Sequence, residues 1–224
     1  MKCAEASLKL IILFLLALPI HIYGSGIIKE NGRGYLLYTD TKTGIIYELY
    51  YTSMWNVPRL YFECRAVGFD ENYVSSSVVI PGKITLHLPI YGDEYEDIVM
   101  DVAGISGTYG DTKCSFKSSK VTSITIENST KPLESEYFKD REGNKLKYLT
   151  GAIDCENLIE LKLPMNINYL HSFSVKSGKL KLQLPDNIVG IENCLFDCEE
   201  VEFPATTTYY SWTTMLGDNF KSVT

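Results

Sequence analysis

The sequence predicts a leucine-rich repeat solenoid, in which short parallel strands stack along one axis, preceded by a small N-terminal β domain. Three observations lead to this prediction. Leu149, Leu170 and Ile191 follow one another at intervals of 21 residues. The prolines that end the same three lines of sequence keep nearly the same spacing, with the last interval slightly shorter: Pro164, Pro185 and Pro204. From residue 34 to 88, apolar runs separated by turn-forming residues are typical of short strands.

Each repeat contains an apolar–polar–apolar step followed by proline, as in Leu161-Lys162-Leu163-Pro164. Such a step predicts a short strand with one buried face. Because one strand cannot bury its apolar face alone, neighbouring repeats share a core, and each buried leucine contributes about 1.5–3 kcal/mol of transfer free energy. The proline lacks an N–H donor and ends the pairing. The alternative is a run of unrelated amphipathic strands, which the shared spacing of leucines and prolines disfavours.

The same lines of sequence resemble the BspA-like leucine-rich repeats of bacterial exported and surface proteins. A typical coil of that family carries Ala-Phe, then Cys, then Leu, and then a strand that ends in Pro. The stretch GAIDCENLIELKLP supplies these positions with Ala152, Ile153, Cys155, Leu158, Leu161, Leu163 and Pro164. The next coil keeps Phe173 and Leu182 but has Lys176 at the cysteine position and Lys179 at the leucine position. The resemblance covers residues 99–224, apart from an insert at 127–147.

The resemblance implies a protein-binding role, because BspA-like proteins are associated with adhesion to host proteins and to other cells. We therefore expect a protein partner, on a host or a cell surface. The predicted strands present a row of polar side chains to solvent, which is the expected partner-binding face: Thr125, Glu160, Lys162, Lys181, Gln183, Glu200 and Glu202. This row is mixed in charge, which fits protein recognition better than phosphate binding.

Residues 1–24 are interpreted as a secretory signal peptide. Residues 10–18 form a nine-residue apolar run near two lysines, which is too short for a bilayer that needs about twenty residues. Small residues allow cleavage after Gly24 or Gly26. A buried N-terminal helix is the alternative. The chain is therefore expected to be exported, to the periplasm, the cell surface or the medium.

The chain is acidic, with 21 basic and 28 acidic residues and a formal net charge of −7 at pH 7. Removal of residues 1–24 takes away Lys2, Lys9 and Glu5, so that 19 basic and 27 acidic residues and a net charge of −8 remain. Phosphate backbones and anionic lipids repel such a chain. The charge therefore argues against nucleic acids and anionic membranes as main partners.

Residues 25–98 are predicted to form a β domain that caps the first repeat, because a solenoid needs a cover over its exposed end. Its expected strands are residues 35–39, 45–51, 59–66, 76–80 and 83–88. This region is rich in aromatic residues, among them Tyr47, Tyr50, Tyr51, Trp55 and Tyr61. Either they pack a sheet face against the core, or they form an exposed stacking platform. The second possibility makes a glycan-binding accessory protein the alternative function.

Two polar segments interrupt the strand pattern. Residues 127–147 form a charged insert, expected as a surface excursion with a short helix around residues 133–139. An acidic cluster ahead of it is expected to be a solvated hairpin tip, the alternatives being a Ca²⁺ site or an acid–base pair. Its members are Asp93, Glu94, Glu96 and Asp97.

The sequence contains no motif for a known reaction, cofactor or metal site, so we expect no enzyme and no bound cofactor. His87 and His171 lie far apart in the sequence and are expected to be structural. Five cysteines remain after residue 24, an odd number that cannot pair fully within one chain: Cys64, Cys114, Cys155, Cys194 and Cys198. Cys155 is expected as a buried core residue. Cys194 and Cys198 are expected as two buried thiols, the alternative being one disulfide.

Overall fold

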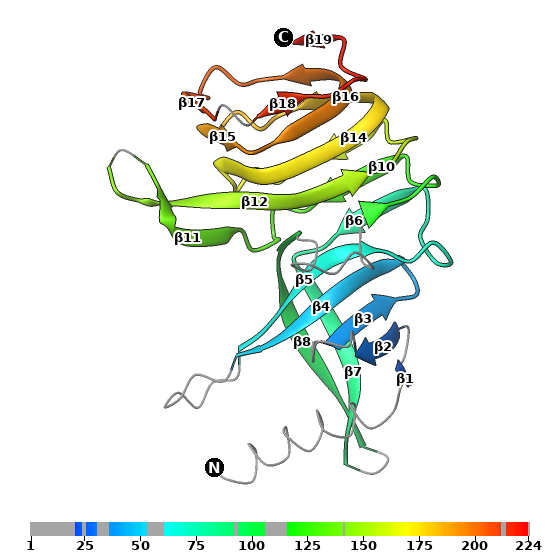
Figure 1. The fold of residues 1–224 in the computed structure, drawn as a ribbon. Coiled ribbons are helices and arrows are strands. Elements are labelled where there is room, and N and C mark those ends of the chain that lie inside the picture. Colours follow the sequence, from blue (N-terminus) through cyan, green and yellow to red (C-terminus); the bar gives the residue numbers. More distant parts are fainter. Residues whose placement is uncertain are drawn as a thin grey trace.

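The computed structural model describes residues 21–23, 26–30, 36–52, 61–91, 94–105, 116–140, 142–211 and 214–223. Within these ranges the chain consists of strands, turns and connecting segments, and the strands form three sheets (Figure 1). No helix in the described part of the chain is long and apolar enough to cross a membrane. The all-strand architecture agrees with the β-rich fold that the sequence predicts.

A seven-stranded sheet forms the N-terminal part of the structure, in the order β1-β2-β3-β4-β5-β8-β7. Its strands are β1 (His21–Tyr23), β2 (Gly26–Glu30), β3 (Leu36–Asp40), β4 (Ile45–Thr52), β5 (Tyr61–Phe69), β7 (Lys83–Tyr91) and β8 (Glu94–Ile105). Neighbouring strands are antiparallel except β5 and β8, which are parallel. Fully buried residues such as Ile45, Cys64 and Val102 join this sheet to the core of the whole chain.

The five strands predicted between residues 35 and 88 are all present, with ends that differ by at most three residues. Strands β1 and β2 have no counterpart in the prediction, and β1 falls inside the predicted signal peptide. The apolar run at residues 10–18 lies outside the described residues. The signal peptide and its cleavage therefore stay predictions.

A second sheet joins the N-terminal region to the rest of the chain. It contains β6 (Ser77–Ile80), β10 (Ser123–Ile126) and β13 (Glu160–Lys162), all parallel, in the order β13-β10-β6. Strand β6 was expected in the N-terminal domain but pairs with β10. Strand β8, moreover, runs across residue 98, where the sequence predicts the border of the repeats. The division at residue 98 stays a prediction, and it does not coincide with a break between sheets.

The third sheet contains the remaining strands, all parallel to their neighbours except β11, and it is called the parallel stack. Its strands are β9 (Phe116–Lys117), β11 (Leu133–Lys139), β12 (Lys145–Asp154), β14 (Tyr169–Gln183), β15 (Gly190–Glu192), β16 (Leu195–Glu202), β17 (Tyr209–Tyr210), β18 (Met215–Leu216) and β19 (Ser222–Val223). Leu149 pairs with Leu170, and Leu170 with Ile191. Neighbouring strands are therefore shifted by the same interval that separates these residues in the sequence. This pairing is compatible with the predicted solenoid, which stays a prediction.

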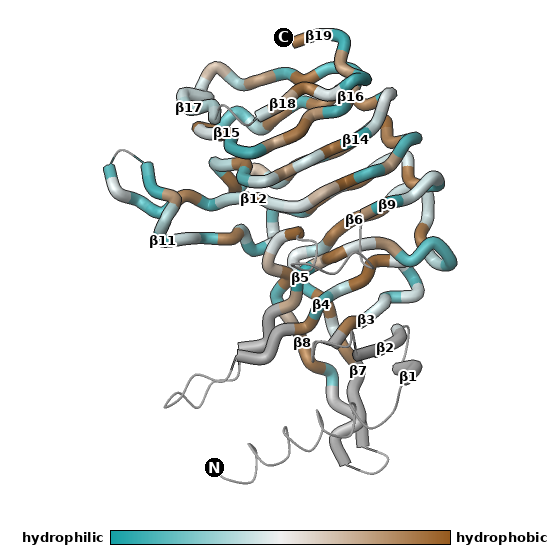
Figure 2. The backbone as a smooth tube through the Cα atoms, in the orientation of Figure 1, coloured by the Kyte–Doolittle hydropathy of each residue, from teal (hydrophilic) through white to brown (hydrophobic). Residues whose placement is uncertain are grey.

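Rows of buried apolar side chains hold the parallel stack together. Leu149, Leu170 and Ile191 form one such row, and each is at most 1% exposed. A second row consists of Ile153, Val175 and Phe196. Polar and apolar residues alternate along much of the stack (Figure 2). At residues 179–183 of β14 the apolar ones are buried and the polar ones are exposed. Because every row runs from strand to strand, each strand depends on its neighbours for burial.

A backbone corner recurs once in each repeat. Gly151, Ser172 and Asn193 all have positive φ, at 130°, 50° and 54°. Past this corner the shift between β12 and β14 increases by one residue, because Leu149 pairs with Leu170 but Gly151 with Phe173. Strand β14 therefore has one residue more than β12 at this corner, whereas β14 and β16 keep the same shift beyond it.

This extra residue corrects one assignment made from the sequence. Lys176, expected at the cysteine position, is exposed, whereas its neighbour Ser177 is 1% exposed and lies opposite Cys198. The Ser177 hydroxyl donates to the carbonyl oxygen of Leu158 at 2.7 Å. A serine is accommodated in this buried row because its hydroxyl has a partner.

A ladder of polar side chains links the turns between successive repeats. Asn166 and Asn187 occupy equivalent positions, and each donates through Nδ2 to two backbone carbonyl oxygens of the preceding repeat. The distances are 2.8 and 2.9 Å to Asn128 and Thr130, and 2.7 and 2.6 Å to Met165 and Ile167. In the next repeat, which is shorter, the Thr206 hydroxyl donates to the carbonyl oxygens of Asp186 and Ile188. These bonds satisfy carbonyl groups that the strands leave unpaired.

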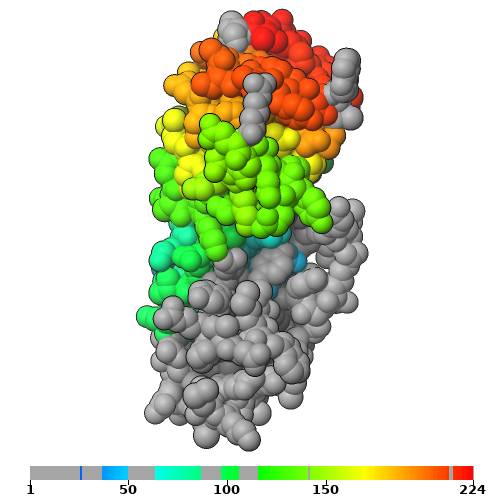
Figure 3. All heavy atoms as spheres, turned by 90° about the vertical axis from the view of Figure 1, so that its left-hand side faces the viewer, coloured from blue at the N-terminus to red at the C-terminus, as the bar shows by residue number. Residues whose placement is uncertain are grey.

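Residues 133–147 form a hairpin, called the arm, that projects beside the parallel stack (Figures 1 and 3). The short helix predicted around residues 133–139 is wrong, because β11 pairs antiparallel with β12. Phe138 packs its ring against Tyr148 and Tyr169, with centroid distances of 5.1 and 5.3 Å. The segment pairs with the edge of β12, and Phe138 makes aromatic contacts with distant residues. These interactions outweigh the helical preference expected from the local sequence.

The four cysteines in the described part of the chain are buried free thiols: Cys64, Cys155, Cys194 and Cys198. The expectation for Cys155 is confirmed, and the disulfide considered between Cys194 and Cys198 is wrong. Burial raises the pKa of the thiols of Cys155, Cys194 and Cys198 to about 11. Cys114 lies outside the described residues.

Replacing Asn187 by alanine is expected to lower the free energy of unfolding by about 1–3 kcal/mol, because two carbonyl oxygens lose their donor. Urea denaturation of the variant and of the matched surface change Gln183→Ala measures the effect. Equal midpoints for the two variants would show that the ladder contributes nothing.

Thiol labelling at pH 8 tests the burial of the cysteines. The full chain contains six cysteines, and we expect at most two to react in the native state, since four are buried and burial raises the pKa of three of these thiols. The four buried thiols should react as well in urea without a reductant. A disulfide that involves Cys64, Cys155, Cys194 or Cys198, located by peptide mass mapping after labelling, would contradict the structure.

Candidate functional site

The predicted partner-binding face lies on the strands where the sequence places it. Its members lie on β10, β13, β14 and β16, and pairing sets Thr125 beside Lys162, Lys181 beside Glu200 and Gln183 beside Glu202. All seven predicted residues are exposed or half-exposed. Their role in binding stays a prediction.

Four of the five charged side chains of this face form ion pairs with one another. Lys162 Nζ lies 2.8 Å from a carboxylate oxygen of Glu160, and Lys181 Nζ lies 3.3 Å from Glu200. The Ser123 hydroxyl also donates to Glu160 at 2.9 Å. These bonds, that from Lys162 first, lower the pKa of the exposed Glu160 carboxyl. Such surface pairs contribute little to stability, and they leave the face close to neutral.

The N-terminal aromatic residues give little support to an exposed platform. Tyr47 is 1% exposed and stacks on Tyr38 with a centroid distance of 6.2 Å. Burial is the main cause that raises the pKa of its hydroxyl. The platform is therefore wrong at Tyr47, which packs into the core. Trp55 lies outside the described residues, as do the side chains of Tyr50, Tyr51 and Tyr61.

The acidic cluster is only partly described. Asp93 lies outside the described residues, whereas Glu94, Glu96 and Asp97 belong to β8. Among the described residues, no three histidine, cysteine or carboxylate side chains gather as metal ligands would. The solvated-tip interpretation and its two alternatives stay predictions.

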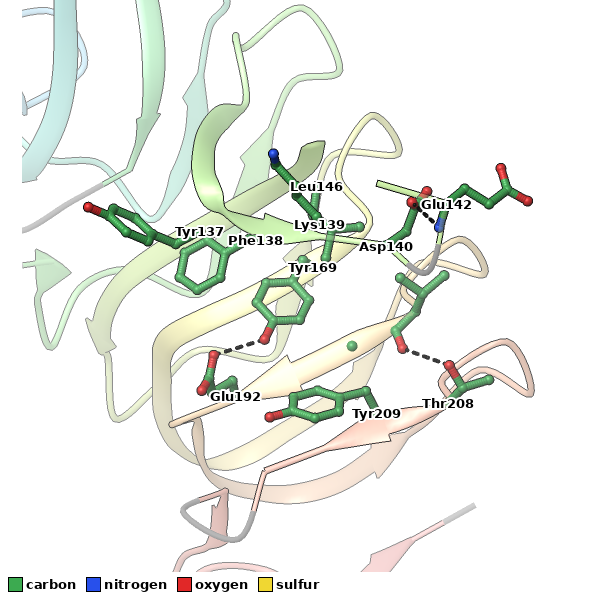
Figure 4. Close-up of a pocket in the computed structure, with 12 residues that line it drawn as sticks. Tyr137, Phe138, Lys139, Asp140, Glu142, Leu146, Tyr169, Glu192, Thr208 and Tyr209 are labelled. Carbon is green, nitrogen blue, oxygen red and sulfur yellow. Dashed lines mark hydrogen bonds between the residues drawn. The ribbon is translucent and has the colours of Figure 1, made fainter. Parts of the chain in front are cut away.

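A pocket of about 660 Å³ lies between the arm and the edge of the parallel stack, and it is called the arm pocket (Figure 4). The arm contributes residues 137–140, Glu142 and Leu146, and strands β14, β15 and β17 with their flanking residues contribute the rest. Its aromatic and charged lining consists of Tyr137, Phe138, Lys139, Asp140, Glu142, Tyr169, Glu192 and Tyr209. Segments that are far apart in the sequence thus meet at one cavity.

The pairing of successive repeats builds the floor of the arm pocket. Tyr148 pairs with Tyr169, Tyr169 with Gly190, and Gly190 with Tyr209, so these four residues form one outward row. A Cβ atom on Gly190 would lie 2.4 Å from Cε2 of the Tyr169 ring. Glycine is therefore required at this position for the Tyr169 ring to lie across the row and stack on Tyr209, at a centroid distance of 6.5 Å.

Glu192 is the carboxylate at the back of the arm pocket. It accepts a hydrogen bond from the Tyr169 hydroxyl at 2.8 Å, and His171 Nδ1 lies 3.2 Å from the same oxygen. Burial, and then the bond to Glu192, raises the pKa of Tyr169. Tyr169 therefore remains a hydroxyl donor that fixes the Glu192 side chain, which is 26% exposed. His171, expected to be structural, is half-buried, and its ring contacts this carboxylate.

The tip of the arm is held by Asp140. Its carboxylate accepts hydrogen bonds from Asn144 N and Nδ2 at 2.8 and 2.9 Å, and from the backbone N–H of Glu142 at 2.9 Å. The bonds from Asn144, followed by weaker backbone bonds, lower the pKa of the Asp140 carboxyl. The Phe138 ring lies 4.5 Å from the His171 ring and anchors the base of the arm. The arm pocket is therefore formed by restrained side chains on both sides.

The sequence contains a signal for this site that is separate from the spacing of the leucines and prolines. Tyr148 and Tyr169 occupy equivalent positions in successive repeats and Tyr209 follows at the next-but-one repeat, which places aromatic residues on one outward row. The insert that carries Tyr137 and Phe138 was expected only as a surface excursion. No sequence pattern indicates that the insert folds back over that row.

No protein-family model, curated protein or solved structure matches this chain. Membership of the BspA-like family therefore remains a prediction that rests on the residues of the repeats.

The role of Gly190 can be tested by a double-mutant cycle. Gly190→Ala is expected to lower the free energy of unfolding by about 1–3 kcal/mol, because the new methyl group overlaps the Tyr169 ring. In a Tyr169→Ala background the same change should cost less than half as much, since the ring is gone. Urea denaturation of the four proteins measures both values. An equal cost in both backgrounds would contradict the close approach of the two residues.

Proposed function

We propose that this chain is an exported, BspA-like leucine-rich repeat protein that binds a protein partner and catalyses no reaction. The parallel pairing of Leu149 with Leu170 and of Leu170 with Ile191 supports the repeat assignment, since it agrees with the spacing of the leucines and prolines. Export is inferred from the apolar run at residues 10–18 alone.

The observation that carries the binding proposal is the arm pocket. Aromatic and charged side chains from the arm and from three strands converge on one cavity of about 660 Å³, a size within the usual range for ligand sites. Aromatic residues are enriched where proteins bind one another, because they offer large contact areas at low conformational cost. The strand face is less suited than the arm pocket to be the centre of an interface, because most of its charges are paired with one another.

Binding fits the arm pocket better than catalysis does. A catalytic site needs a nucleophile or a titrating group that is free to react. Cys194, which lies close to Glu192 in the sequence, is 1% exposed, and its pKa is raised to about 11 by burial. Glu192 itself is held by Tyr169 and His171. These contacts fix geometry and so favour recognition over turnover.

A glycan remains the second candidate ligand, and one observation favours it. Tyr209 is 50% exposed and Tyr137 is 93% exposed, and exposed rings of this kind can stack on sugars. This candidate differs from the glycan site first expected on the N-terminal sheet, where Tyr47 is buried.

The function is tested by capture of the purified protein on an array of extracellular matrix proteins and polysaccharides. We expect saturable capture by protein spots. Tyr209→Ala should weaken it by about tenfold or more if the arm pocket is the centre of the interface. The paired change Lys162→Ala with Gln183→Ala on the strand face should weaken it less. Capture by polysaccharides alone would contradict the proposal.

A further inference from the structure

The lining of the arm pocket has an excess of negative charge. Of the described residues that line it, Asp140, Glu142 and Glu192 carry carboxylates, and Lys139 alone carries an ammonium group. Lys139 Nζ already lies 3.6 Å from a carboxylate oxygen of Glu136 on the same strand. Arg141 lies outside the described residues. The hydrogen bonds that lower the pKa of Asp140 keep that carboxylate ionised at neutral pH.

Three carboxylates of the lining accept hydrogen bonds, and two of its hydroxyl donors are already engaged within the protein. The Tyr169 hydroxyl already donates to Glu192 at 2.8 Å, and the Thr208 hydroxyl to the carbonyl oxygen of Val189 at 3.5 Å. Ionised carboxylates can only accept. A ligand that contacts these carboxylates has to bring donors. A guanidinium group brings five N–H donors together with a positive charge, whereas a sugar hydroxyl brings one donor and no charge.

Aromatic rings lie next to these carboxylates. Tyr209 is 50% exposed and stacks on Tyr169, and Phe138 is half-buried above the same row. Cations on apolar stems are attracted to the faces of such rings, and the stem packs against them. In Figure 4 the rings of Phe138, Tyr169 and Tyr209 lie one below another between the arm and the strands, with Glu192 beside Tyr169, whereas the Glu142 carboxylate extends away from them at the rim. The combination suits a cationic side chain.

We propose that the arm pocket binds a short basic segment of a protein partner and takes an arginine or lysine side chain between its rings and carboxylates. The cavity of about 660 Å³ exceeds the volume of one side chain and has room for its neighbours in the segment. The net charge of −7 adds a long-range attraction for a basic partner. This inference rests on the proposed function, because it names the chemistry that the partner presents to the same site.

The probe is a short Gly/Ser peptide that contains two arginines, titrated into the purified full-length protein by calorimetry. The matched probe has citrulline in place of arginine, which keeps the shape and removes the charge. We expect the citrulline peptide to bind at least about tenfold more weakly, and binding of the arginine peptide to weaken as salt is added. Equal affinities, or no heat from the arginine peptide at millimolar concentration, would overturn the inference.

Variants assign the binding to the arm pocket. Glu142→Gln and Glu192→Gln should each lower the affinity for the arginine peptide by about threefold to tenfold. The glutamine oxygen at position 192 can still accept the Tyr169 hydroxyl, so the fold is kept. Asp154→Asn is the control, because Asp154 pairs with Lys117 at 3.4 Å, on a different part of the stack from the pocket. An equal loss in the control would mean attraction to the acidic surface in general and would overturn the site.

The ring at position 209 gives a second, independent readout. Tyr209→Leu should lower the affinity for the arginine peptide and Tyr209→Phe should not, because only the change to leucine removes the aromatic ring. Equal affinities of the two variants would overturn the contact between cation and ring.

Failure of this inference can be told apart from failure of the proposed function. Capture of an array protein that survives Glu142→Gln and Glu192→Gln would leave the function standing and refute the basic segment. An array that captures no protein would refute the function, whereas the peptide titration would still decide the chemistry of the pocket.

Discussion

Parallel backbone pairing between residues that lie 21 positions apart in the sequence determines how the stack is built. It sets Leu149, Leu170 and Ile191 in one buried row. Because side chains alternate between the two faces of a strand, the same register aligns Tyr148 and Tyr169 in the neighbouring outward row. A slip by one residue would exchange the two faces. Core and candidate site are therefore fixed by one register.

The arm pocket follows from that register together with one departure from it. Within the outward row Gly190 stands where its neighbours carry rings, and the missing side chain lets the Tyr169 ring lie flat and reach Glu192. The arm adds Phe138, whose ring packs on Tyr169 and closes one side of the cavity. The repeats supply a regular surface, and the arm turns one part of it into a concave site.

The sequence predicts those features whose burial is visible in the local pattern of apolar and polar residues. Periodic leucines predicted the strand shift, and the odd number of cysteines with Cys155 in an apolar line predicted buried thiols. It failed where partners lie far apart in sequence. The helix expected at residues 133–139 is a strand because the edge of β12 pairs with it. Ser177 replaces Lys176 in the buried row because the corner at Ser172 adds a residue, which spacing alone does not show.

Hydrogen–deuterium exchange of the protein with and without a captured partner shows whether the partner is held where the arm meets the stack. We expect slower exchange at residues 137–146, 189–192 and 208–209, with little change on strands β10 and β13. Protection confined to β10, β13 and the 181–183 end of β14 would contradict it and would favour the strand face as the interface.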